Sequence, residues 1–223
     1  MERKTGLGPK GLRWMIWVLI LLMVIVIGLS WIFYAESYEF FGEATSYLGG
    51  FQTWHEKNPN NLSQRIFTIG FLVIGIYSIF ISLSYFLHTK EFRFALLKGI
   101  LLVVIGFGAL GIAIPHDIGT SIVYLHSIGA FMFLSGLAVL NFTLQILRCV
   151  TRYNPSCEEK NFDYYIDYSF VVILILAAIF YFLIEVLYFA GIILIGITPP
   201  IPQKIVLITT VIAAGLLDLD DMR

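Results

Sequence analysis

The chain has 223 residues, of which 59% are hydrophobic and 13% charged, and its mean hydropathy is +0.88. A soluble domain carries about 25% charged residues, so this chain has too little polar surface to cover a water-facing globule, and the composition predicts a membrane protein. The formal net charge of -1 excludes the basic surface that nucleic acid requires, so we expect no nucleic-acid partner.

Five apolar runs are long enough to cross a bilayer, because about 20 helical residues span roughly 30 Å of hydrocarbon. In chain order they are residues 14–33, 66–87, 95–114, 122–147 and 166–190. Basic residues precede the first run, as in a signal peptide. The run is too long for a signal peptide, however, and no small-residue cleavage motif follows it, so we expect a retained helix.

The last part of the chain allows two interpretations. From Ile166 to Ile197 it stays apolar for about 30 residues, which is more than one crossing needs. Gly191 and Gly196 weaken a helix there, and the prolines of residues 198–202 end it. We predict a sixth crossing over residues 201–217, and a half-crossing or interfacial helix is the alternative.

The basic residues predict the orientation, since Lys and Arg concentrate in cytoplasmic loops. With the N-terminus inside, eleven of the 14 basic residues are inside, and Lys57, Arg65 and Lys204 are outside. The inner set is Arg3, Lys4, Lys10, Arg13, Lys90, Arg93, Lys98, Arg148, Arg152, Lys160 and Arg223. The sequence therefore predicts one all-α integral membrane domain over residues 1–223. It has six helices, both termini inside, and lies in the plasma membrane.

Residues 34–64 form the one long loop of this topology and are expected on the outer side. Its first part has a helical periodicity that separates two sets of side chains. One face holds Tyr34, Tyr38, Phe41, Thr45 and Leu48, and the other holds Glu36, Glu39 and Glu43. This pattern predicts an interfacial helix whose aromatic face lies toward the headgroups.

Ionisable side chains at membrane depth are costly, so each one is a candidate functional residue. His126 lies about one and a half turns inside the fourth predicted helix. Glu185 lies near the outer end of the fifth, with Tyr181 and Tyr188 on the same face. The alternative is that His126 and Glu185 only form hydrogen bonds within the bundle.

The short turn after the third predicted helix adds His116 and Asp117 to this set. In the predicted topology they lie on the same side of the membrane as His126 and Glu185. His55 and Glu56 of the long loop lie on that side too. We expect all these residues, with the two tyrosines, to line one outward-open pocket that handles a polar headgroup. The alternative for the turn is that its charges are simply solvated.

The sequence predicts no metal site and no cofactor. His116 and His126 lack a recognised ligand spacing, and His88 lies at the other end of the bundle from His126, which excludes a haem held between them. Ser121, His126 and Asp117 could form a hydrolytic triad, but serine and aspartate are common at helix starts. The glycines of the third helix, Gly106, Gly108 and Gly111, indicate close helix packing.

Two stretches of the chain resemble a known family. The first runs from Ser46-Tyr47-Leu48-Gly49-Gly50 through Asn58-Pro59 to FTIGFLVIGI, which begins at Phe67. The second contains GALGIAIPHDIGT and LHSIGAFMF, between Gly108 and Phe133. Together they are similar to the uncharacterised prokaryotic branch of the Frag/DRAM/Sfk-like membrane proteins. The similarity in layout covers roughly residues 10–217.

This resemblance implies six helices with both termini inside. It maps a P-x-D turn onto Pro115 and Asp117, and an H-x-x-G-A motif onto His126, Gly129 and Ala130. Family members are linked to remodelling of lipid anchors, phospholipid organisation and autophagy-related membrane regulation. The branch has no established catalytic residues to carry over, and His116 departs from its pattern.

Three functions follow as hypotheses. The first is a non-enzymatic protein that binds or organises membrane lipids or assists a membrane partner. The second is a membrane-embedded lipid hydrolase or acyltransferase that uses His116, Asp117, His126 and Glu185, with a histidine beside a carboxylate as general base. The third is an accessory subunit of a larger membrane complex, whose partners would be other membrane proteins.

Overall fold

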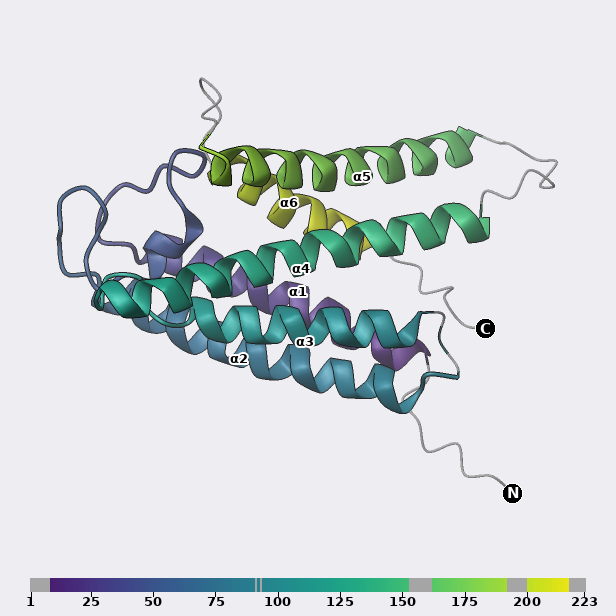
Figure 1. The fold of residues 1–223 in the computed structure, drawn as a ribbon, viewed down its shortest axis with the longest axis horizontal. Coiled ribbons are helices and arrows are strands. Elements are labelled where there is room, and N and C mark those ends of the chain that lie inside the picture. Colours follow the sequence, from purple (N-terminus) through teal and green to yellow (C-terminus); the bar gives the residue numbers. More distant parts are fainter. Residues whose placement is uncertain (1–8, 91, 93, 153–161, 192–199, 217–223) are drawn as a thin grey trace.

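The computed structural model describes residues 9–90, 92, 94–152, 162–191 and 200–216, which contain helices and no strand (Figure 1). In chain order the helices are α1 (Pro9–Ile32), the 3-10 helix η1 (Thr45–Gly49), α2 (Asn61–Leu87), α3 (Ala95–Ile112), α4 (Thr120–Arg152), α5 (Phe162–Phe189) and α6 (Pro200–Leu216). The α-helices run back and forth along one long axis, so α1 begins and α6 ends at the same end of the bundle (Figure 1). We call the opposite end, which carries residues 33–60 and the turn 113–119, the loop end.

The five long apolar runs are confirmed as helices, and each is long and apolar enough to cross a membrane. The predicted break after the fifth run is also confirmed, because α5 ends at Phe189. Gly191 follows in the left-handed conformation, with φ of 75°, which glycine adopts without steric cost. A sixth helix forms as expected, but α6 has 17 residues and is shorter than the other five. Its crossing of the bilayer stays a prediction.

The long helices keep much of their apolar surface on the outside of the bundle. Only 39–50% of the residues in each candidate span are buried. Large apolar side chains are exposed on every one of these helices, including Leu21, Ile76, Leu96, Ile128 and Val186. Soluble monomers rarely expose apolar surface on this scale, whereas hydrocarbon solvates it. These are the features of a multi-pass membrane protein.

Glycines bring α3 into backbone contact with both of its neighbours. A Cβ on Gly75 of α2 would lie 2.9 Å from the carbonyl oxygen of Gly106 on α3. A Cβ on Gly129 of α4 would lie 2.6 Å from the Cα of Gly111 on α3. A side chain at either position would force the helices apart, so these glycines allow the close packing that the sequence predicted.

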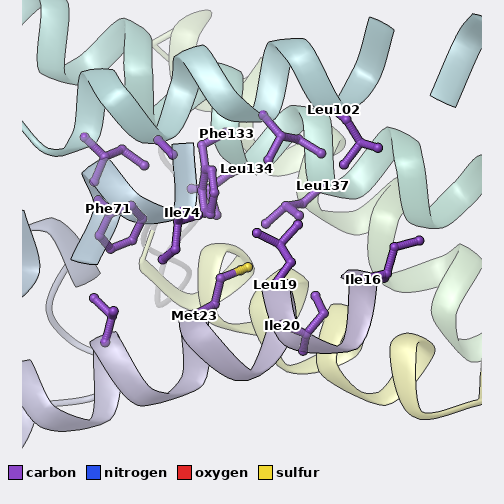
Figure 2. Close-up of a cluster of buried hydrophobic side chains, with 14 of the residues drawn as sticks. Ile16, Leu19, Ile20, Met23, Phe71, Ile74, Leu102, Phe133, Leu134 and Leu137 are labelled. Carbon is purple, nitrogen blue, oxygen red and sulfur yellow. The ribbon is translucent and has the colours of Figure 1, made fainter. Parts of the chain in front are cut away.

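The core lies where α1 meets α2, α3 and α4. Figure 2 shows the side chains of Leu19 and Met23 from α1 near those of Ile74 and Phe133. All four are at most 2% exposed. In lipid this packing contributes through van der Waals contact and not through removal of apolar surface from water, so a close fit of shapes matters more than apolar area.

The predicted interfacial helix at the start of the loop is wrong. Residues 34–44 form turns and bends, and η1 is the one helix within the fully described stretch 33–60. The helical periodicity assigned Glu43 to the water side, but this residue is only 3% exposed. Its backbone oxygen accepts a hydrogen bond from the Tyr38 hydroxyl. On a helix these two side chains would point about 140° apart. The chain turns back here so that both are buried.

The contact of α3 with α4 gives a direct test. Gly129→Ala places a methyl group against the backbone of α3, and we expect it to lower stability by about 1–3 kcal/mol. The measurement is the thermal unfolding midpoint of the purified protein in detergent. Gly28→Ala on α1 is the matched control, because no heavy atom lies within 4 Å of its added Cβ. Equal midpoints for the two variants would contradict this account of the packing.

Candidate functional site

The loop consists of two arms, residues 33–44 and 51–60, joined by η1 and packed on the loop end of the bundle. At the end of the second arm, the Asn60 side-chain amide donates to the backbone oxygens of Leu48 and Gly50, at 3.1 and 3.0 Å. Asn60 is itself 1% exposed. These contacts fix η1 to the start of α2 and therefore fix the positions of both arms.

Side chains of the first arm bind the backbone of the second. The Tyr34 hydroxyl accepts a hydrogen bond from Trp54 N at 2.9 Å, and Glu36 accepts from His55 N and Glu56 N, each at 3.0 Å. Desolvation acts to raise the pKa of the Glu36 carboxyl, but these two amides outweigh it and hold the pKa below its usual value. Burial raises the pKa of Tyr34 to about 12, so its hydroxyl stays protonated. The two arms therefore form one hydrogen-bonded unit.

Lys204 of α6 anchors this unit to the bundle. It is 1% exposed, and its ammonium donates to the Tyr38 hydroxyl and to the backbone oxygen of Glu43, each at 2.8 Å. It also lies over the rings of Tyr38 and Phe40. A buried ammonium is costly unless it is hydrogen-bonded, so these oxygens hold the loop against α6. Sequence reasoning missed this role, although a lysine inside a short apolar helix was a visible signal.

His116 and His126 lie side by side under the loop. Their ring centroids are 5.8 Å apart, and Nδ1 of His126 donates to the backbone oxygen of Ile114. Nδ1 of His116 and Nε2 of His126 are buried and have no hydrogen-bond partner within the described part of the chain. Burial lowers the pKa of His116, although the Asp117 carboxylate acts in the opposite direction. The pair can therefore offer two ring nitrogens to a polar group.

The turn that carries His116 is tied to the second arm of the loop. Asp117 accepts a hydrogen bond from Gln52 N at 2.9 Å. Tyr47 of η1 has its ring centroid 5.4 Å from that of His116 and stacks on Trp54 at 4.1 Å. His116, Asp117 and His126 therefore belong to one structural group at the loop end.

The residues predicted on α5 form a second group. Tyr181 is fully buried, Glu185 is 7% exposed and lies beside Gln203 of α6, and Tyr188 is exposed. Among the residues that the structure describes, no hydrogen bond or ion pair joins Glu185 to the histidine group. The convergence of all the predicted residues on one pocket stays a prediction, and the structure brings together three of them.

Between the two groups lies a cavity that sequence reasoning did not identify. Its empty volume, which includes space open to the surroundings, is about 420 Å³. Its wall is mostly apolar and comes from the five helices α1, α2, α3, α4 and α6, through Ile27, Phe67, Phe71, Ile112, Ala130, Phe133, Leu134 and Leu207. Its polar lining consists of Thr45, Ser46 and Gln203. Figure 2 shows Phe71, Phe133 and Leu134 close together in this part of the core.

The cavity adjoins both predicted groups. Gln203 lines it and lies beside Glu185. Ala130 lines it one helical turn after His126, and Ser46 lines it next to Tyr47, which contacts His116. No motif in the sequence marks the cavity, because the residues that line it come from segments far apart in the chain.

Comparison of the chain with known protein families, with curated proteins and with solved structures gives no match.

The Lys204 contacts predict how the loop is held. Lys204→Met removes two hydrogen bonds from a charged donor, each worth about 1.5–3 kcal/mol. We expect amide hydrogen exchange at Tyr47 in η1 and at Gly50, which follows η1, to become at least about tenfold faster, since η1 would open more often. Lys57→Met is the control, because Lys57 is an exposed lysine of the same loop. Unchanged exchange in the Lys204 variant would show that the loop is held by other contacts.

Proposed function

We propose that this multi-pass membrane protein is non-enzymatic and binds a membrane lipid in the cavity under its loop. The observation that carries the proposal is the lining of that cavity. Three phenylalanines and several aliphatic side chains suit an acyl chain, while Thr45, Ser46 and Gln203 offer hydrogen bonds to a headgroup or ester. The histidine pair is close to this polar part in the fold, because the His116 ring contacts Tyr47, the neighbour of Ser46 in the chain.

The proposed setting of this site is the outer leaflet of the plasma membrane. The distribution of basic residues supports an inside N-terminus, six crossings and a loop on the outer side. The resemblance to the Frag/DRAM/Sfk-like proteins supports both the topology and a role in lipid organisation. A partner membrane protein would then meet the lipid-facing surfaces of the bundle.

A hydrolase or acyltransferase is the second candidate, and the histidine pair is the observation that favours it. A neutral imidazole with a free nitrogen can act as a general base on a headgroup ester, and Asp117 is adjacent to His116 in the chain. Lipid binding needs only the cavity, whereas this reaction also needs the histidines. Release of fatty acid from added phospholipid by the purified protein, lost in His126→Gln, would favour the enzyme.

Filling the cavity tests the proposed function. Ala130→Phe projects a ring into the space, and we expect co-purified lipid to fall at least about tenfold, equivalent to about 1.4 kcal/mol of binding free energy. Lipid is quantified by native mass spectrometry after purification in mild detergent. Ile128→Phe is the control, because Ile128 lies on the exposed face of the same helix. A wild-type protein without lipid, or equal lipid in both variants, would exclude this site.

The proposed topology has a separate test. In a variant with Cys149 and Cys157 changed to serine, a single cysteine replaces either Ser37 or Thr89, both exposed. We expect an impermeant maleimide added to intact cells to label Ser37→Cys, while Thr89→Cys reacts only after permeabilisation. The reverse pattern would place the loop and its cavity on the cytoplasmic side.

A further inference from the structure

Three side chains with metal-binding atoms meet where the two arms of the loop cross. They are Glu36 and Glu43 from the first arm and His55 from the second. One ligand atom from each lies within 4.8 Å of the other two. This group is separate from the cavity lining and from the histidine pair. Of its members, only His55 was among the residues that the sequence predicted for an outward-open pocket.

The carboxylate of Glu43 is the feature that points to a ligand. Its Oε1 accepts from Glu39 N and from His55 Nε2, each at 3.2 Å. Its Oε2 is buried and has no hydrogen-bond partner in the part of the chain that the structure describes, although Glu43 is only 3% exposed. An unpaired oxygen on a buried carboxylate is costly, and a cation at that oxygen removes the cost.

Lys204 is not the cation that pairs with this carboxylate oxygen. Its ammonium donates to the backbone oxygen of Glu43, and its charge also acts on Glu43, but among the described residues the two side chains form no ion pair. His55 approaches the same carboxylate from the water side, with its side chain 58% exposed. Water therefore reaches the group through His55, while Glu43 forms its buried side.

We propose that Glu36, Glu43 and His55 bind a divalent transition-metal ion, with Zn²⁺ as the best fit. Imidazole nitrogens and carboxylate oxygens are both ligands of Zn²⁺, and water can complete a coordination shell that three side chains begin. Mg²⁺ and Ca²⁺ prefer oxygen ligands throughout, so the imidazole selects against them. On binding, the metal replaces the proton that His55 Nε2 donates to Glu43, and the neutral ring carries its proton on Nδ1 instead.

The positions of the ligands are already set before a metal binds. The Glu36 carboxylate is held by the backbone amides of His55 and Glu56 and by the Thr53 side chain, and with about four lone-pair sites a carboxylate can still accept one more partner. A metal at this point would link the first arm of the loop directly to the second. Occupancy would therefore stabilise the loop above the lipid cavity, although the metal site does not depend on a lipid being bound.

Titration of Zn²⁺ alone into the purified protein tests the site. The protein is used in detergent with its affinity tag removed, and binding is followed by calorimetry and by the thermal unfolding midpoint. We expect one Zn²⁺ per chain and a higher midpoint, because a ligand that binds only the folded state stabilises it. His55→Ala should weaken binding more than about tenfold, since loss of even an outer-shell partner costs that much.

Matched variants separate this site from the alternatives. Glu56→Gln changes an exposed neighbour outside the group and should bind Zn²⁺ like the wild type. Glu36→Gln should weaken binding while its remaining side-chain oxygen still accepts a backbone hydrogen bond. The proposal is overturned if the wild type binds no Zn²⁺, if it binds Mg²⁺ equally well, or if His126→Gln abolishes binding while His55→Ala leaves it intact.

Discussion

The backbone contact between α3 and α4 is the constraint on which the site depends. Because Gly111 and Gly129 have no side chains, the two helices touch at this level, near the loop end. The contact places His126 against the carbonyl oxygen of Ile114 and brings the next turn of α4, with Ala130, to the cavity wall. The histidine pair and the cavity are therefore consequences of one packing geometry.

The loop is held by polar contacts that would be costly to leave unmade. Lys204 donates to a hydroxyl and a carbonyl oxygen, Glu36 binds two backbone amides, and Asn60 binds two carbonyl oxygens. Side chains and backbone groups buried at the edge of a bilayer have little water to replace such partners. This explains how a loop with little regular structure covers the bundle in one conformation.

The sequence predicted the features that depend on local pattern. Long apolar runs identified the helices, and the glycines of α3 identified close packing. Prediction from the sequence failed where the surroundings of a side chain come from segments far apart in the chain. The spacing of Tyr34 and Tyr38 marked buried positions but not the turn that also buries Glu43, and the cavity and the Glu36–Glu43–His55 group arise only when separate segments meet. His116 lies in the short turn before α4 and His126 lies in the second turn of that helix, so their short separation in the chain places both at the same end of the bundle.

The contact between Lys204 and Tyr38, which holds the loop on the bundle, joins residues that the ribosome synthesises at very different times. Tyr38 and Lys204 are separated by 166 positions, and at about 5–20 residues per second the ribosome needs roughly 8–33 s to travel between them. Throughout that interval α6 is absent, so the nascent loop lacks its contacts with Lys204, and the cavity lacks the wall that carries Gln203 and Leu207. The cavity is therefore complete only after the last helix has been synthesised and has packed against the others.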